Sequence, residues 1–207
     1  RRYEGGGAML EAVKLCKAFD GRPVIRDFSM RLDPGCRVCL TGPSGSGKTT
    51  LLRLLMGLEK PDSGQLSIPS GTRFSAVFQE DRLLEQLTAA ANVSLVSPAP
   101  LGDITALLKA LGLDMESLVQ PVSAFSGGMK RRVALCRALL AQYDVLCLDE
   151  PYKGLDASLR EQVIQVVDAY TQGKTVVLVT HDLREAEGYE RIELPNLSSL
   201  PSTSESQ

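Results

Sequence analysis

The chain lacks the long apolar run that a membrane-spanning helix needs. No stretch of its 207 residues approaches about 18 consecutive apolar residues, and no secretory signal peptide is visible near the N-terminus. We therefore expect any role at a membrane to depend on a partner protein. Residues 1–8, with three glycines before Met9, are interpreted as a leader or as residues added by cloning. The Ser/Pro-rich tail, residues 196–207, is expected to be disordered.

An excess of either charge is also absent. Lys and Arg number 23 against 25 Asp and Glu, which gives a formal net charge of −2. Such a balance offers no broad basic surface, so nucleic acid is not an expected partner. The basic cluster formed by Lys130, Arg131, Arg132 and Arg137 is interpreted as a solvated helix face. With 43% apolar and 23% charged residues, the composition is typical of one globular α/β domain with a subdomain.

Cysteine is scarce, and its pattern does not indicate a disulfide framework. The five cysteines are odd in number and lie mostly in predicted strands or helices, which predicts buried, reduced thiols. Cys36 and Cys39 have the spacing of a zinc or redox pair. However, an offset of three along a strand points them to opposite faces, which disfavours either role.

One segment with three glycines fits the pattern G-x-x-x-x-G-K-[ST]. The segment consists of Gly42, Pro43, Ser44, Gly45, Ser46, Gly47, Lys48, Thr49 and Thr50. Glycines let successive N–H groups turn inward to form a nest for an anion, and a following helix adds its dipole. Val38–Leu40 before the loop is predicted to be a buried strand. The alternative is an ordinary turn, but the strand, loop and helix order favours a phosphate site in which Lys48 contacts the β- and γ-phosphates and Thr49 binds Mg²⁺.

A second predicted strand ends in two acids. Residues 145–148 are apolar and are followed by Asp149 and Glu150. In α/β proteins, ligands bind at the carboxyl ends of parallel strands. Asp149 is expected to hold the magnesium shell, and Glu150 to orient or deprotonate a water molecule. Taken alone, two acids after a strand would more simply indicate a solvated loop. The presence of the glycine segment at residues 42–50 favours a functional site instead.

The remaining pattern predicts an antiparallel start, a parallel core and an inserted helical part. Residues 10–40 alternate in the manner of strands, with turns at Asp20-Gly21 and at residues 33–35. From about residue 87 to residue 118 the pattern is helical, with Asp103 as a cap and Gly112 as a stop. A helix is expected from residue 126 to about residue 142. Another is expected to start at Ser158, in a capping box with Glu161.

Further along the chain, Ser126-Gly127-Gly128 precedes a predicted helix, Gly154-Leu155-Asp156 follows the second strand, and His181 follows a third apolar strand. With these motifs in the same order, the chain resembles the nucleotide-binding subunit of an ATP-binding cassette (ABC) transporter over residues 10 to about 194. The resemblance implies a P-loop NTPase fold of the α/β class. Its parallel core sheet has an N-terminal antiparallel β part and a small helical subdomain, at about residues 85–125, within a single domain of residues 9–195.

The resemblance also implies roles for individual residues. Phe19 would stack on adenine, and Gln79 would sense the γ-phosphate and contact Mg²⁺. Ser126, Gly127 and Gly128 would contact the γ-phosphate of ATP bound to a partner subunit. Asp156 lies in the D-loop, and His181 would assist Glu150 in hydrolysis.

Each of these residues also has an interpretation that needs no family. Phe19 fits a hairpin core position, and Gln79 fits a plain strand end. Ser126 fits an ordinary N-cap, and a lone histidine such as His181 is more often structural. Two departures from the family pattern are Phe125 and Met129 beside the signature. The segments between Gly57 and Gln79 and after His181 are shorter than usual, which affects the surface more than the site.

The implied partners are transmembrane permease subunits, a second copy of the chain in a head-to-tail dimer, and an extracytoplasmic solute-binding protein. The subunit would lie on the cytoplasmic side of the cell membrane, attached through the permease. The motifs around Gln79, Ser126 and His181 look most like those of bacterial nitrate, sulfonate and taurine importers. The alternatives are a soluble ABC ATPase of DNA repair or translation, an export subunit, and a small-molecule P-loop kinase. The kinase would lack the Ser126 signature.

Overall fold

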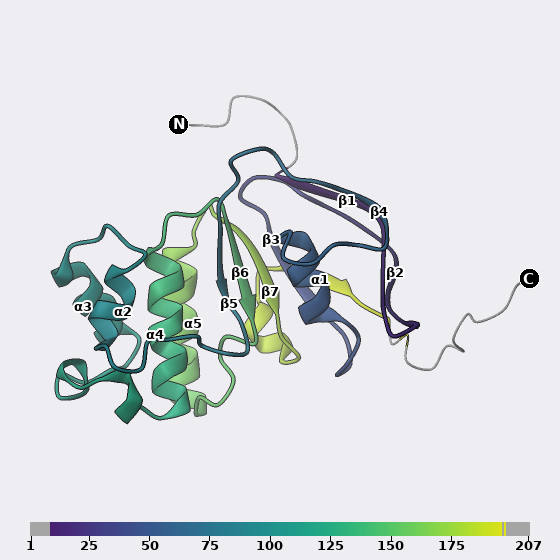
Figure 1. Ribbon diagram of the computed structural model, residues 1–207. Coiled ribbons are helices and arrows are strands. Elements are labelled where there is room, and N and C mark those ends of the chain that lie inside the picture. Colours follow the sequence, from purple (N-terminus) through teal and green to yellow (C-terminus); the bar gives the residue numbers. More distant parts are fainter. Residues whose placement is uncertain (1–8, 196, 198–207) are drawn as a thin grey trace, which may run out of the picture. The chain divides into compact units, whose positions relative to one another are not determined.

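A computed structural model describes residues 9–195 and 197 of the chain. The chain divides into two compact units (Figure 1). Unit 1 consists of residues 1–72 and 174–207, and unit 2 of residues 73–173. The phosphate loop and His181 belong to unit 1. The acidic pair, Gln79 and the Ser126 signature belong to unit 2.

Unit 1 contains a three-stranded antiparallel sheet in the order β2-β1-β4. Its strands are β1 (Leu10–Phe19), β2 (Arg22–Leu32) and β4 (Ser63–Ser67). The β1–β2 turn confirms the predicted one: Asp20 and Gly21 both have positive φ, 50° and 73°, as a type I′ hairpin requires. The sequence analysis missed β4, because only Leu66 among its five residues is apolar and the alternation is absent.

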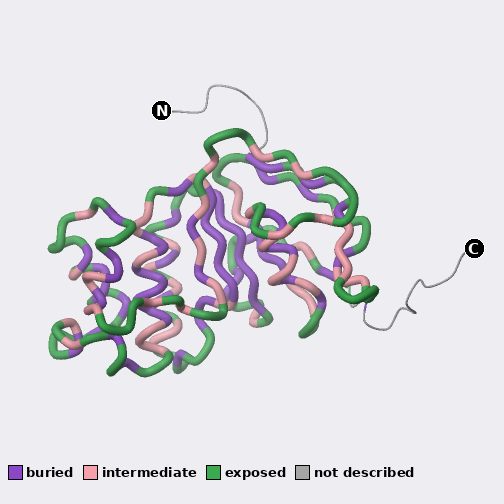
Figure 2. Tube along the Cα trace, in the orientation of Figure 1, coloured by how far each residue is buried: buried purple, intermediate pink, exposed green. Residues whose placement is uncertain are grey.

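The parallel strands of unit 1 position the phosphate loop. Strand β3 (Arg37–Thr41) pairs in parallel with both β7 (Thr175–Val179) and β8 (Glu190–Glu193). Both faces of β7 and the centre of β3 are buried, as the β-branched and leucine-rich sequences predict (Figure 2). Helix α1 (Lys48–Leu55) follows β3 after the loop. The predicted buried strand at residues 38–40 and the strand, loop and helix order are therefore confirmed.

Unit 2 contains two parallel strands and four α-helices. Strand β5 (Phe74–Val77) pairs in parallel with β6 (Val145–Asp149). The helices are α2 (Ala89–Ser94), α3 (Leu101–Ala110), α4 (Gly127–Leu140) and α5 (Ala157–Tyr170). The apolar stripe of α3 is buried: Ile104, Leu107, Leu108 and the adjoining Leu111 are at most 1% exposed. Gly112 follows with φ 83°, which confirms it as the stop.

Two predicted helix caps are wrong. Helix α3 begins at Leu101 after Pro100, so Asp103 lies in its first turn, where its charge still complements the helix dipole. Helix α5 is capped by Asp156, whose extended backbone lets its Oδ1 accept a hydrogen bond from the Leu159 N–H at 3.0 Å. Ser158 therefore lies inside the helix.

The arginine cluster of α4 is not the solvated face that its charge suggested. Arg131 and Arg132 are only 5% and 7% exposed, and Arg137 is partly buried. Each guanidinium donates to backbone carbonyl groups of unit 2, and the carbonyl groups that Arg132 reaches are those of Leu111, Gly112 and Gly128. Burial lowers the pKa of Arg132 and Arg137. A guanidinium group has five N–H donors in a fixed geometry, so a buried arginine can bond to carbonyl groups that are far away in the sequence. The spacing of charged residues along a helix does not reveal such partners.

The prediction of buried thiols holds for Cys39, Cys136 and Cys147, whereas Cys16 and Cys36 are only half-buried. Burial raises the pKa of Cys39 to about 11 and that of Cys136 and Cys147 to about 12. Within residues 9–195 and 197, no three or more His, Cys, Asp and Glu side chains gather in a way that would hold a metal ion. In that same part of the chain, none of the helices is both long enough and apolar enough to cross a membrane.

Candidate functional site

The loop between β3 and α1 has a backbone that only glycine adopts without strain. Gly42, Gly45 and Gly47 have φ values of 139°, 79° and 87°. A β-carbon at Gly47 would lie 2.8 Å from the Val24 carbonyl oxygen, and one at Gly42 would lie 2.6 Å from that of Leu194. At Gly45 it would meet nothing within 4 Å. The loop is therefore packed tightly at both ends and open in the middle.

A single cation lies across this loop. The Lys48 Nζ donates hydrogen bonds to the carbonyl oxygens of Gly42 and Pro43, both at 2.8 Å. Helix α1 begins after Gly47 with neither a side-chain cap nor an acidic residue in its first turn. Its N-terminal N–H groups and the ammonium group therefore present positive charge at one place, where an anion is stabilised.

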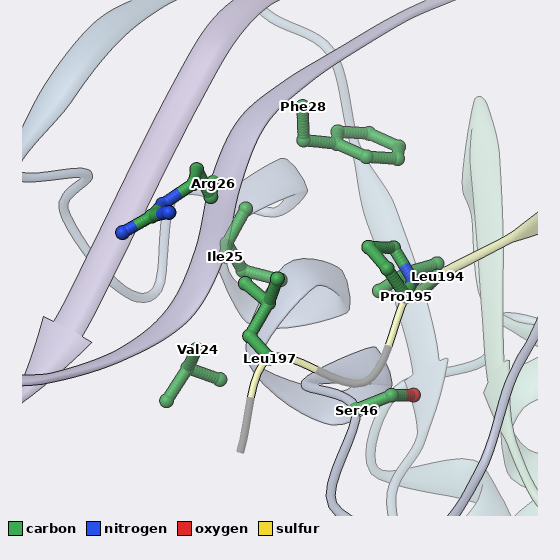
Figure 3. A pocket seen from close by; sticks show the side chains of 8 residues that line it. All are labelled: Val24, Ile25, Arg26, Phe28, Ser46, Leu194, Pro195 and Leu197. Carbon is green, nitrogen blue, oxygen red and sulfur yellow. The ribbon is translucent and has the colours of Figure 1, made fainter. Parts of the chain in front are cut away.

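Ser46 is buried, in contrast to the exposed residues just before it. Its side chain is 2% exposed and lines a cavity of about 10 Å³ with β2 and the C-terminal segment (Figure 3). The other lining residues are Val24, Ile25, Arg26, Phe28, Leu194, Pro195 and Leu197. Among the residues described, the Ser46 Oγ finds no hydrogen-bond partner. Pro43, Ser44 and Gly45 are exposed, whereas Thr49 and Thr50 are half-buried.

The acidic pair at the end of β6 has two distinct environments. Asp149 is the last residue of the strand and is fully buried, whereas Glu150 is half-buried. Glu150 has a φ of 48°, the left-handed region that a residue other than glycine seldom adopts. Its Oε2 lies 3.3 Å from the Lys153 Nζ. The two carboxylates therefore lie in different surroundings.

The other predicted residues of unit 2 lie at the ends of elements. Gln79 is exposed just after β5. Ser126 caps α4 by accepting from the Met129 N–H at 3.3 Å, so its hydroxyl proton remains to be donated. A β-carbon at Gly127 would meet nothing within 4 Å, while one at Gly128 would be in ordinary contact with Gly154 and Leu155 at 3.6 Å. The start of α4 thus presents an open backbone, whereas the Asp156 carboxylate is used as a helix cap.

Phe19 and His181 belong to unit 1. Phe19 closes β1 with 45% of its surface exposed, and the Lys17 Nζ lies 5.2 Å from its ring centre. The alternative placement of Phe19 in a hairpin core is therefore wrong, and the ring is available for stacking. His181 is exposed directly after β7. The neighbouring Thr180 hydroxyl donates to the Glu185 carboxylate at 2.5 Å, which fixes the turn after His181.

Comparisons with known proteins identify the family. The family model described as "ABC transporter" matches residues 25–153. The aliphatic sulfonates import ATP-binding protein SsuB 1 of Rhodococcus jostii (strain RHA1) is 40% identical over 86% of this chain and 74% of its own. The thiamine import ATP-binding protein ThiQ of Chelativorans sp. (strain BNC1) is 39% identical over 87% of this chain and 80% of its own.

A solved structure agrees with these sequence matches. The dimeric structure of MJ0796, a bacterial ABC transporter cassette, superimposes with a TM-score of 0.80 at 28% identity. The match covers 90% of this chain and 94% of that one. The predicted fold class is therefore confirmed. Together with the glycine loop, the acidic strand end and the Ser126 signature, these similarities establish that the chain belongs to the ABC transporter family, as its ATPase subunit.

Proposed function

We propose that this chain binds Mg·ATP and hydrolyses it to drive solute import by a bacterial ABC transporter. The observation that carries the proposal is the loop at Gly42–Thr50, in which three glycines have positive φ, with Lys48 across it and an uncapped helix behind it. Such a loop has little purpose other than to hold an anion. Relatives named as import ATP-binding proteins support the direction of transport.

The residues present fit the nucleotide and its metal ion. The backbone N–H groups around Gly45 and the Lys48 ammonium would bind the phosphates, and the exposed Phe19 ring would stack on adenine. Thr49, Gln79 and Asp149 would hold Mg²⁺ with oxygen ligands, directly or through water. The metal ion would neutralise charge that develops on the phosphate oxygens. Pro43, Ser44, Ser46, Gly47 and Thr50 would complete the loop.

Glu150 is the residue proposed to act on the attacking water. Its carboxylate is half-buried at the end of β6, one residue after a fully buried acid. A general base in such a position accepts a proton from water as the bond to the γ-phosphate forms. His181 and Gln79 would orient the water and the phosphate, and both are exposed at element ends.

We further propose a head-to-tail dimer in which Ser126–Gly128 of one subunit covers the nucleotide of the other. The open backbone at Gly127 and the hydroxyl of Ser126 at the start of α4 support this role, since such groups at a helix N-terminus suit an anion. The dimeric cassette MJ0796 supports the assembly. The dimer would work on the cytoplasmic side of the membrane with permease subunits and an extracytoplasmic solute-binding protein.

The proposed cargo class is a small sulfonate or a related anion. Two SsuB relatives, of Rhodococcus jostii and Pseudomonas syringae, are 40% and 42% identical to this chain. The thiamine relative is 39% identical, and the "Fe(3+) ions import ATP-binding protein FbpC 3" of Rhodococcus jostii is 37% identical over 56% of its length. Substrate choice therefore depends on the permease and binding protein that accompany the chain.

ATP titration by calorimetry and phosphate release test the proposal together. Lys48→Ala should weaken ATP binding and abolish turnover because it removes the charge facing the phosphates. Glu150→Gln should keep the parent affinity but lower turnover by about two to four orders of magnitude, the scale of a lost general base. Unchanged ATP affinity in Lys48→Ala would place the nucleotide elsewhere, and parent turnover in Glu150→Gln would exclude it as the base.

A further inference from the structure

Arg131 joins two segments that flank the proposed catalytic residues of unit 2. It lies in the second turn of α4 and is 5% exposed. One guanidinium nitrogen, Nη1, donates to the Phe78 carbonyl oxygen and lies 3.0 Å from the Asp81 Oδ1. The other, Nη2, donates to the carbonyl oxygens of Asp149 at 2.7 Å and Glu150 at 2.9 Å.

These four acceptors come from the two chain segments that follow β5 and end β6. Gln79 lies between Phe78 and Asp81, and Glu150 is itself one of the partners. The guanidinium group is planar and rigid, so its two nitrogens keep a fixed separation and direction. One rigid group therefore bonds both to the segment around Gln79 and to the Glu150 backbone. Lysine has a single charged point and would not link both segments in this way.

The backbone of Glu150 needs such support. Its φ of 48° is disfavoured for a residue with a β-carbon and persists only where the surroundings hold it. The Lys153 N–H also donates to the Glu150 carbonyl at 3.3 Å, but that contact lies within the same turn. The bond from the Arg131 Nη2 is shorter and comes from a different element.

We propose that Arg131 is a positioning residue for ATP hydrolysis, which holds Glu150 in its left-handed conformation and couples it to the Gln79 segment. This inference rests on the proposed function of Glu150. Arg131 does not contact the reacting atoms in this scheme, because all four of its bonds go to the protein. Its loss should therefore affect turnover and leave nucleotide affinity nearly unchanged.

The test uses the full chain, with the permease present if the isolated subunit is silent. Arg131→Lys keeps the positive charge and removes the pair of guanidinium nitrogens that bond to the two segments. It should lower kcat by about 10- to 100-fold, the scale for misplacing a catalytic group by about 1 Å, while the Kd for ATP changes less than about threefold. Arg73→Gln is the matched control. The Arg73 side chain binds the Asp144 carboxylate where β5 and β6 begin, so it also links these strands, and Arg73→Gln should keep the parent kcat.

A double-mutant cycle separates positioning from general loss of structure. If Arg131 acts through Glu150, adding Arg131→Lys to Glu150→Gln should leave the residual turnover of Glu150→Gln unchanged within about twofold. An equal drop in both backgrounds, a parent kcat in Arg131→Lys, or a Kd that moves as much as kcat would overturn the inference. Parent turnover in Glu150→Gln alone would refute the proposed function of Glu150 instead.

Asp81→Asn provides a second variant if Arg131→Lys does not fold. It changes only one of the four partners, and its carboxylate is 20% exposed, so folding should survive. A fall in kcat of about 3- to 10-fold with parent ATP affinity, absent in the Glu150→Gln background, supports the inference. A parent kcat in Asp81→Asn would refute it.

Discussion

Substituting alanine at Gly47 and Gly45 tests whether the phosphate loop is held by its neighbours or only by its own conformation. Both glycines have φ near 80–90°, at 87° and 79°, so a new methyl group meets the same backbone penalty of about 1–2 kcal/mol at either position. The gain from a less flexible unfolded chain is also the same for both. The two variants therefore differ only in what the methyl group contacts.

At Gly47 the methyl group would lie 2.7 Å from the Val24 Cγ1 and 2.8 Å from the Val24 carbonyl oxygen. Overpacking of this kind costs typically about 1–3 kcal/mol, and a backbone oxygen cannot move aside as a side chain can. We expect Gly45→Ala to lose about 1–2 kcal/mol of unfolding free energy and Gly47→Ala about 2–5 kcal/mol.

Urea denaturation followed by circular dichroism, without nucleotide, measures this difference. The slope with urea should stay constant, so that the shift in midpoint reports stability alone. Equal losses of unfolding free energy in the two variants would mean that the β2 backbone around Val24 shifts to accommodate the methyl group at no energetic cost. The close packing of the loop against β2 would then not hold the loop's shape.

Two further predictions concern the assembly and the buried thiols. Lys48→Ala and Ser126→Arg should each be inactive alone, but mixing them should restore one of two sites, with a maximum ATPase rate near equal amounts; background rates despite demonstrated heterodimers would exclude shared sites. Burial raises the pKa of Cys136 and Cys147 to about 12 from 9.0, so the unfolded chain loses these protons first as pH rises. Stability should therefore be unaffected by these thiols below about pH 9 and fall above it, by up to about 1.4 kcal/mol per thiol and pH unit; a double Cys→Ala variant with the same slope between pH 9 and 10.5 would contradict this.

The parts of the fold that could be predicted are those in which local pattern and burial coincide. The apolar runs of β3, β6 and β7 and the glycine loop carry their own signals, because a parallel strand is buried on both faces and a positive φ requires glycine. Strand β4 could not be predicted, because its pairing with β1 rests on backbone hydrogen bonds between largely exposed residues. The cap of α5 was misplaced because Ser158 and Asp156 are both good caps by composition, and only the extended backbone of Asp156 decides between them.

The candidate site followed the same division. The pattern around Lys48 and Glu150 predicts them as site residues, and the resemblance to the family adds Ser126. Arg131 was assigned to a solvent face because a run of basic residues on a helix usually lies there. What distinguishes it is its contact with Phe78 and Glu150, which are 53 and 19 residues away along the chain. No local pattern contains that information, although the buried carbonyls after two strand ends indicate that some donor must reach them.

The hydrogen bonds from the Lys48 ammonium group to the carbonyl oxygens of Gly42 and Pro43 give this lysine a structural role in the loop without bound nucleotide. The ammonium group links the first two residues of the loop to the start of α1 by hydrogen bonds. A neutral side chain of similar length, as in Lys48→Met, would fill the same space and still leave both carbonyls without that donor. The loop would then lose its shape as well as its charge. Part of the affinity for nucleotide that a substitution of Lys48 removes therefore comes from the preformed shape of the loop. The conformation of the loop before nucleotide binds thus contributes to the binding free energy.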